Sequence, residues 1–497
     1  MEFISGEGRE QIILIPETIE GYIDENNTVR VIDAYINSLD LGILKFKRYQ
    51  PGETGRPPYD PKDILKLFVY GYMNRIRSSR RLEAESKRNL ELLWLLCKLA
   101  PDHKTIANFR KENPLALKNV FCDFVKLCIK LDLYGKELAA IDGSKFKAVN
   151  SKDRNFTRDK LADRIKRIER TIDEYLKDLD QTDVEEDAVE KEKSTQEIQR
   201  IVKELNERKT LYQEYKKELE ENKETQKSLT DSDSRLMLAN GKMDVCYNVQ
   251  TAVDSKNKLI TEFEVTNNAN DMNQLTPMTK KVQEILETKT IAVTADAGYA
   301  SASDIAAAVQ LGVQVHVAGT DYDMCVPAKE GDEKTEIKTP TNGRCVYVKE
   351  RNIVICPMGN VLYPKHYNKE KGEAEFQNSQ ACKSCTCRCT KEERGFRYRF
   401  VMAEDDFKTD CNDKELAVKQ IHIKPKKEIY EQRKSLSEHP YGTIKRSMDA
   451  GYCLMKGKLE VSGEFSLIFL TYNLKRVINI LGSNKLIEIM AYQGSPV

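Results

Sequence analysis

Two stretches of residues 155–228 carry apolar side chains at alternating spacings of four and three residues, and predicted strands flank them on both sides. The first stretch runs from Leu161 to Leu179, and the second runs from Ile198 to Leu219. This spacing is typical of the seam between paired helices. Because an acidic linker, residues 180–192, separates the two stretches, we expect an antiparallel helical hairpin inserted into another fold.

The segments around this hairpin predict alternating strands and helices. A strand is expected at residues 138–142, and two strands with a period of two are expected at 244–253 and 258–266. A helix, a strand that ends at Asp296, a second helix and a last strand then follow, at 274–287, 290–296, 301–310 and 313–317. With the hairpin removed, this is the element order of a ribonuclease H-like mixed α/β core.

The length of 497 residues is too great for one ordinary core, so we divide the chain into segments. They are an N-terminal helical module (1–134), the first core strand (135–152), the helical-hairpin insertion (153–230), the ribonuclease H-like core (231–318), a Cys-rich insertion (319–418) and a C-terminal helical part of the core (419–497).

Composition favours a globular protein without a membrane span. The apolar run at residues 465–470 is far too short to cross a bilayer, and residues 1–17 lack the basic and apolar segments of a secretory signal. We therefore expect a cytoplasmic location. The net charge is only +1, but basic residues are clustered locally, which suits phosphate contacts.

The N-terminal module predicts short helices that could bind DNA. Helical periodicity begins after Asp60, and Thr105 is a predicted N-cap for a helix that carries Asn108 and Arg110. A helix-turn-helix-like module is one interpretation, and a plain helical bundle is the alternative. The basic residues that we expect at DNA are Arg80, Arg81, Lys104, Arg110, Lys445 and Arg446.

Three carboxylates fall at elements that a ribonuclease H-like sheet would bring together. Asp142 ends the first strand, Asp296 ends the fourth, and Glu438 lies in a later helical segment. Phosphodiester chemistry with two divalent cations needs hard anionic ligands of this kind. Taken singly, each has a simpler interpretation: a turn residue, a polar strand end and a solvent-facing charge.

The segment around Glu438 also contains a candidate residue for contact with DNA phosphates. Lys445 follows Glu438 by seven residues and is expected on the same helix face. Because Pro440 belongs in a first turn or at a kink, we expect Glu438 near the start of a helix.

Asp271 precedes a predicted helix and is interpreted as its cap.

With these motifs in place, the chain resembles bacterial insertion-sequence transposases of the DDE class, in the branch marked by a Tyr-Arg-Glu-Lys signature. The resemblance spans about residues 40 to 480. The matching segments are SSRRLE (78–83), PDHKTI (101–106), IDGSK (141–145), YNVQTAVD (247–254), ADAGY (295–299), EHPYGTIK (438–445) and YNLKR (472–476).

The resemblance implies a DNA transposase with Asp142, Asp296 and Glu438 as metal-binding triad and with Tyr430, Arg433 and Lys445 as supporting signature. Four residues separate Arg433 from Glu438, whereas the general signature has three. It also implies two Mg²⁺ ions, which Mn²⁺ can replace, double-stranded DNA (terminal inverted repeats and target) as partner, a homodimer on DNA and association with the nucleoid. The alternatives are a nuclease of the same fold without strand transfer, and a DNA-binding protein without catalysis.

The Cys-rich insertion offers a candidate zinc site. Cys356, Cys382, Cys385 and Cys389 could provide four thiolates for structural Zn²⁺. Reduced thiols in an inserted subdomain are the alternative, because the upstream partner of the C-x₂-C unit is a single cysteine.

Overall fold

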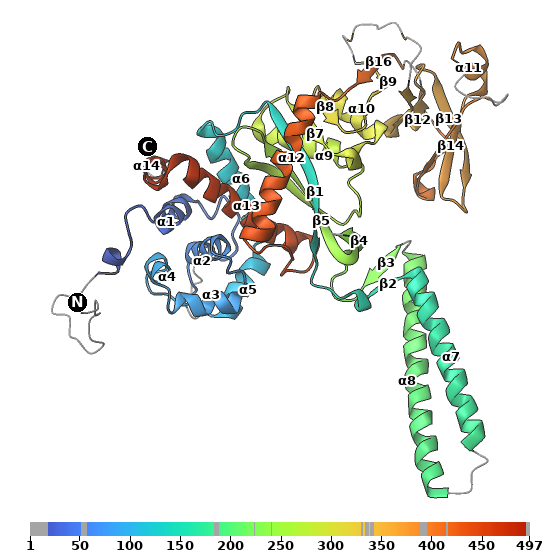
Figure 1. Ribbon diagram of the computed structural model, residues 1–497, viewed down its shortest axis with the longest axis horizontal. Helices are drawn as coiled ribbons and strands as arrows, with labels where there is room; N and C mark the ends of the chain where they lie inside the picture. Colours follow the sequence, from blue (N-terminus) through green and yellow to red (C-terminus); the bar gives the residue numbers. More distant parts are fainter. Residues whose placement is uncertain are drawn as a thin grey trace, which may run out of the picture.

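The protein is built around one mixed sheet from which two further parts project (Figure 1). The computed structural model describes residues 18–50, 57–182, 188–222, 224–239, 241–329, 332, 337, 342–387, 395–413 and 416–493. The α/β class predicted from the sequence is confirmed.

The central sheet has the strand order β4-β5-β1-β7-β8, and β6 also pairs with β5. β5 lies antiparallel to β1, β4 and β6, whereas β7 lies parallel to both β1 and β8. The strands are β1 (Leu138–Lys147), β4 (Arg235–Ala239), β5 (Lys242–Asp254), β6 (Ile260–Thr266), β7 (Ala292–Ala295) and β8 (Gln314–Val317).

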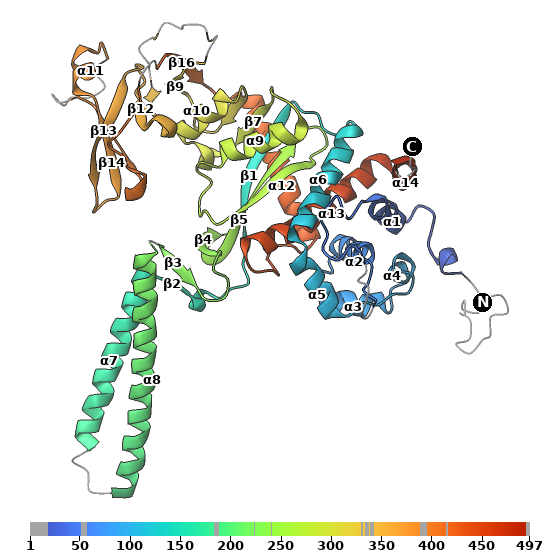
Figure 2. The same cartoon turned by 180° about the vertical axis from the view of Figure 1, so that it is seen from behind.

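Helices cover both faces of this sheet. α12 (Lys427–Gly442) lies across β1, β5, β7 and β8, as Figure 1 shows, and its Leu436 packs on Leu138 and Ala140. The opposite face is covered by α9 (Leu275–Leu286), which contacts β1, β5 and β6 and is seen from its own side in Figure 2. α10 (Ala302–Gln310) packs beside α9.

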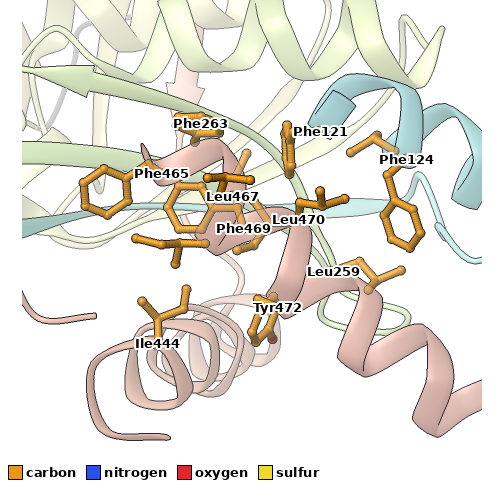
Figure 3. Close-up of a cluster of buried hydrophobic side chains, with 14 of the residues drawn as sticks. Phe121, Phe124, Leu259, Phe263, Ile444, Phe465, Leu467, Phe469, Leu470 and Tyr472 are labelled. Carbon is orange, nitrogen blue, oxygen red and sulfur yellow. The ribbon is translucent and has the colours of Figure 1, made fainter. Parts of the chain in front are cut away.

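The deepest part of the core surrounds α13 (Lys458–Leu481). Aromatic side chains of α13, α6 (Pro114–Lys130) and β6 meet there, and Phe469, Phe121 and Phe263 pack against one another (Figure 3). The packing of such rings contributes about 0.5–1.5 kcal/mol per pair beyond area burial. No helix among the described residues combines the length and the apolar character needed to cross a bilayer.

The N-terminal helices share one hydrophobic core with the sheet, and two of them, α2 and α5, pack directly on α13. They are α1 (Thr28–Ser38), α2 (Pro61–Met73), α3 (Ser79–Ser86), α4 (Leu90–Leu95) and α5 (His103–Glu112), and α14 (Ser483–Gln493) packs against α1. The helix predicted to begin at Thr105 is capped by Asp102 instead, whose carboxylate accepts from the backbone N–H groups of Lys104 and Thr105. The prediction did not consider Asp102, three residues before Thr105, as the N-cap of this helix.

A long pair of helices extends away from the sheet (Figure 1). α7 (Arg158–Thr182) packs against α8 (Ala188–Glu221), and the antiparallel strands β2 (Asn155–Thr157) and β3 (Gln226–Ser228) join them at their base. Phe156, Leu161 and Leu219 form a small separate core where the pair begins.

The described part of residues 319–423 forms two small sheets. The expectation that the C-terminal helical part begins at residue 419 is wrong, because residues 418–423 form a strand. β10 (Gly343–Arg344), β9 (Tyr322–Pro327) and β16 (Val418–Ile423) pair in that order. The second sheet has the order β11-β12-β13-β14-β15, with β11 (Val346–Val348), β12 (Ile353–Ile355), β13 (Val361–Asn368), β14 (Glu373–Gln377) and β15 (Arg397–Val401), and α11 (Ser379–Ser384) follows β14. Several of these strands span only two or three residues, which is too short for a clear alternating pattern.

Candidate active site

Asp142 and Asp296 lie at the same end of two neighbouring strands. Asp142 is within β1, opposite Thr251 of β5, and Asp296 directly follows β7. Because β1 and β7 are parallel and adjacent, the chain directions bring both carboxylates to one edge. The Asp296 carboxylate accepts from the backbone N–H of Gly298 at 2.8 Å, which fixes it at the turn after the strand.

The electrostatics of Asp142 show that the two carboxylates are close. Burial raises the pKa of Asp142 to about 6, and the negative charge of Asp296 adds to the rise. The Ser437 hydroxyl and the Arg433 guanidinium, both from α12, act in the opposite direction. Two neighbouring negative charges attract a cation, and a cation between them would remove their mutual repulsion.

Tyr441 ties α12 to the strand that carries Asp142. Its buried hydroxyl donates to the carbonyl of Val249 at 2.7 Å, lies 3.1 Å from the carbonyl of Asp142, and accepts from Thr251 at 3.0 Å. This phenol therefore joins the helix to β1 and β5 at the level of the candidate site.

Arg433 and Tyr430 lie about two and three turns before Tyr441 on α12. The Arg433 guanidinium is 5.5 Å from the ring centre of Tyr430, and its buried Nε has no hydrogen-bond partner among the described residues. Arg433 also acts electrostatically on Asp142, so this residue of the signature contributes to the surroundings of the first carboxylate.

The structure does not gather Glu438 with the two aspartates. Ser437, one residue earlier, is buried against the Asp142 side of the helix, whereas Glu438 is exposed. Among the residues that the structure describes, no three His, Cys, Asp or Glu side chains come together closely enough to hold a metal ion. The site in this structure is therefore a carboxylate pair.

The prediction that Glu438 lies near a helix start is wrong. Pro440 lies inside α12, near its C-terminal end, so Glu438 is in the last turns of the helix. A π-helical turn, Thr443–Ser447, follows directly. Proline removes one helical hydrogen bond and crowds the preceding turn, and here it lies just before the change in helix geometry.

Lys445 is carried by this π-helical turn and reaches the same strand. Its ammonium donates to Ser144 Oγ at 2.6 Å and to the carbonyl of Lys145 at 3.2 Å, and it lies 4.6 Å from the ring centre of Phe146. Burial lowers its pKa. The lysine of the signature therefore lies two residues along β1 from Asp142.

Most of the basic residues expected at DNA are exposed, but one of them, Arg110, is buried. Arg80, Arg81, Lys104 and Arg446 are exposed, and a shallow depression between α3 and α5 is lined by Arg80 and Lys104. Arg110, in contrast, is only 5% exposed, and its guanidinium donates to the hydroxyl of Tyr72 at 2.7 Å. The prediction for Arg110 is wrong, because the side chain points into the helical core.

A group of polar residues that the sequence analysis did not connect lies beside Gly143. The Asp271 carboxylate accepts from the side-chain amides of Asn248 and Gln250, so it is not the helix cap that its position suggested. α9 begins after Gln274, and its first two backbone N–H groups, those of Leu275 and Thr276, donate to the carboxylate of Asp304 in α10 and not to Asp271. One signal was present in the sequence: Asn248 and Gln250 are two polar residues at alternating positions, which places both on one face of the strand.

The candidate zinc ligands are only partly described. Cys356 is buried after β12, Cys382 lies in α11, and Cys385 follows that helix, whereas Cys389 lies outside the described residues. Burial raises the pKa of the Cys356 thiol, and the nearby Cys385 adds to the rise. The structure thus places Cys356 and Cys385 near each other.

Comparisons with known proteins match both ends of the chain to transposases. Residues 17–112 match a family described as Transposase domain (DUF772), and residues 355–478 match a family described as Transposase DDE domain. No curated protein sequence matches. A cryo-EM structure of a piggyBac transposase synaptic complex with hairpin DNA covers 94% of this chain and 79% of its own, at 9% identity and a TM-score of 0.32.

The two family matches define the class of protein, a transposase. Together they support the assignment of this chain as an insertion-sequence DDE transposase, and the second supports a DDE-type enzyme. The second match contains Glu438 and the whole of α12, and its class depends on divalent metal ions in general.

Proposed function

We propose that this transposase binds the terminal inverted repeats of its insertion sequence, cleaves DNA there and joins the freed 3′-hydroxyl to target DNA. The proposed catalytic domain is a ribonuclease H-like core, since β6-β5-β1-β7-β8 are antiparallel on one side of β1 and parallel on the other. The observation that carries the proposal is that Asp142 and Asp296 lie at the same end of the adjacent parallel strands β1 and β7, where the charge of Asp296 helps to raise the pKa of Asp142.

The residues of the pair fit a divalent cation. Mg²⁺ keeps several waters and is often held by only one or two carboxylates, so Asp142 and Asp296 would suffice for a first ion. We propose Glu438 as the third ligand, because it directly follows Ser437 on the helix that contacts Asp142. When bound, Mg²⁺ or Mn²⁺ activates the attacking oxygen and stabilises the leaving one.

The protein itself would position the carboxylates and the DNA. Tyr441 holds α12 against the backbone of β1 and β5, and Arg433 offsets part of the negative charge at Asp142. Lys445, which donates to Ser144 beside the candidate site, and the exposed Arg446 next to it would contact the phosphate backbone. Arg80, Arg81 and Lys104 would contact the element end from the N-terminal helices.

Cleavage would proceed by attack of water on a phosphodiester, which forms a new P–O bond and releases a 3′-hydroxyl. In strand transfer the 3′-hydroxyl would attack a target phosphodiester, and a target 3′-oxygen would leave.

We further propose that two copies of the protein act together, one at each end of the element. We also propose that a structural Zn²⁺ is held by the thiolates of Cys356, Cys382, Cys385 and Cys389.

The test is cleavage and joining of a DNA duplex that carries the element's own end, with Mg²⁺ or with EDTA. We expect Mg²⁺-dependent cleavage and joined products for the wild type, and a loss of at least about 100-fold for Asp142→Asn, Asp296→Asn and Glu438→Gln. Glu431→Gln, an exposed carboxylate on the same helix, is the matched control and should keep full activity.

Each alternative function has its own outcome in this assay. Cleavage without joined products would show a nuclease of the same fold. Specific binding of the duplex without cleavage under any of these metal conditions would show a DNA-binding protein and contradict the proposal.

A further inference from the structure

Asp271 is the centre of a polar network on the face of the sheet opposite α12. Its Oδ1 accepts from Asn248 Nδ2 at 2.7 Å and from Gln250 Nε2 at 2.6 Å, and its Oδ2 lies 3.4 Å from Lys145 Nζ. Both amide side chains are completely buried, and the Asp271 side chain is 15% exposed. Two buried amides that donate to one carboxylate oxygen fix its position strongly, because charge-assisted hydrogen bonds are about twice as strong as neutral ones.

The network continues to the turn that carries Asp296. Tyr299 donates its hydroxyl to Gln250 Oε1, so one amide side chain joins Asp271 to Tyr299. The backbone N–H of Tyr299 donates to the carbonyl of Asp296 at 3.2 Å. A continuous chain of hydrogen bonds therefore runs from Asp271 to the main chain of the second candidate catalytic residue.

The same network touches β1 one residue after Asp142. Gly143 pairs with Gln250, and a Cβ at position 143 would lie 2.3 Å from Asp271 Oδ1 and 2.3 Å from Gln250 Nε2. The carboxylate and the amide therefore pack directly on the backbone of β1. Any larger residue at position 143 would push them away from the strand.

Asp271 is also near Gly298, the residue whose N–H holds the Asp296 carboxylate. A Cβ at position 298 would lie 3.7 Å from Asp271 Oδ2 and 2.9 Å from Asp296 Oδ1. The network thus contacts the two segments that carry the carboxylate pair, the strand at Asp142 and the turn at Asp296. Its members belong to β1, β5, the segment between β6 and α9, and the turn after β7.

Resting on the proposed function, we propose that Asp271 is a positioning residue that fixes the spacing between Asp142 and Asp296. It acts through Gln250 and Tyr299 on the turn of Asp296, and through its packing on Gly143 on the strand of Asp142. A carboxylate suits this role because it accepts several hydrogen bonds at once, and the flat backbone of glycine allows its close approach.

The first test compares Asp271→Ala with Asp271→Asn in the full-length protein. We measure Mn²⁺ affinity without DNA, single-turnover cleavage of the element-end duplex with Mg²⁺, and the thermal unfolding midpoint. Asp271→Ala should weaken Mn²⁺ binding about tenfold and slow cleavage about 10–100-fold, as removal of outer partners of metal ligands typically does. Asp271→Asn keeps an oxygen that accepts from the two amides, so it should stay within about fivefold of the wild type in both measurements.

The matched control is Asp254→Asn. Asp254 is also buried, but it accepts from the backbone of Gly135 and Lys136 at the far end of β5. This variant should lower the unfolding midpoint while leaving Mn²⁺ affinity unchanged. A general loss of stability would in contrast weaken cleavage in the Asp254 and Asp271 variants alike, and that result would overturn the positioning role.

A second variant keeps the test decisive if Asp271→Ala does not fold. Gly143→Ala displaces the same carboxylate by its methyl group, so it should reproduce the loss of Mn²⁺ affinity. The double variant Gly143→Ala/Asp271→Asn should bind Mn²⁺ no more weakly than Gly143→Ala alone, because the effects of residues in one network are not additive.

The outcomes separate this inference from the proposed function. If Asp271→Asn is as damaging as Asp271→Ala, Asp271 binds the metal itself and the positioning role is wrong. If Asp271→Ala leaves both measurements unchanged while Asp296→Asn loses them, only the inference fails. If Asp142→Asn and Asp296→Asn themselves keep Mn²⁺ binding and cleavage, the proposed function fails.

Discussion

Asp142 lies between β5, β7 and α12, in surroundings that favour its protonated form when no cation is bound. Burial raises its pKa to about 6, above the ordinary value of 3.8, and the Asp296 charge adds to the rise. A folded-state pKa above the unfolded one means that the folded protein binds the proton more tightly. Wild-type stability is therefore highest below about pH 4 for this group, and falls as pH rises through about 6.

Replacing Asp142 by asparagine should remove this pH-dependent loss. In EDTA, we expect Asp142→Asn to raise the free energy of unfolding at pH 7.5 by about 1–3 kcal/mol relative to the wild type. The difference should shrink towards pH 4.5, because the wild-type group is then largely protonated. Urea unfolding at the two pH values measures it, with Glu431→Gln as control. An equal effect at both pH values would contradict the conclusion that burial of the ionised Asp142 carboxyl destabilises the folded protein.

At the scale of elements, the site depends on how α12 crosses the sheet. The Tyr441 hydroxyl forms hydrogen bonds with both β1 and β5, so α12 cannot shift along the sheet without breaking them. The end of α12 at Pro440 and the π-helical turn after it direct Lys445 to Ser144. Single π-helical turns are frequent at functional sites.

We expect Tyr441→Phe to destabilise the protein by about 1–3 kcal/mol, because the buried Thr251 hydroxyl and the Val249 carbonyl lose their partner. The measurement is chemical unfolding, with Tyr430→Phe as a control on the same helix. An unchanged unfolding midpoint for Tyr441→Phe would show that this phenol does not secure α12.

The sequence predicts elements better than it predicts contacts between them. Alternating apolar residues located β5, β6 and β8, and helical periodicity located α9 and α10, because these patterns are local. The edge shared by Asp142 and Asp296 followed from the expected strand order. Asp271 was misinterpreted because its partners lie more than 20 residues away in β5, and no local pattern reveals such pairing. Arg110 was misplaced for a similar reason, since its partner Tyr72 belongs to another helix.

At the scale of the whole molecule, a buried ion pair joins the N-terminal helices to the core. Arg77 donates to Glu464 of α13 at 2.6 Å, and to the carbonyls of Asp449 and Tyr452. The Glu464 carboxylate also accepts from the backbone of Leu454. Both side chains are almost fully buried, so the N-terminal helices are held close to the catalytic part of the chain.

Breaking this ion pair should be costly. Glu464→Gln leaves the Arg77 charge buried without its counter-ion, so we expect a loss of about 3–5 kcal/mol in the free energy of unfolding. Glu85→Gln, which breaks the pair with the exposed Arg88, is the control and should leave the unfolding midpoint nearly unchanged. If Glu464→Gln behaves like the control, the interface between these parts does not depend on the pair.

The account rests on a divalent cation held between Asp142 and Asp296, and Mn²⁺ titration followed by electron paramagnetic resonance measures this directly. For the wild type at pH 7.5 we expect stoichiometric binding that weakens as pH falls below about 6, because the Asp142 proton competes with the cation. Asp142→Asn and Asp296→Asn should each lose this binding while remaining folded. Wild-type affinity in either variant would contradict the account.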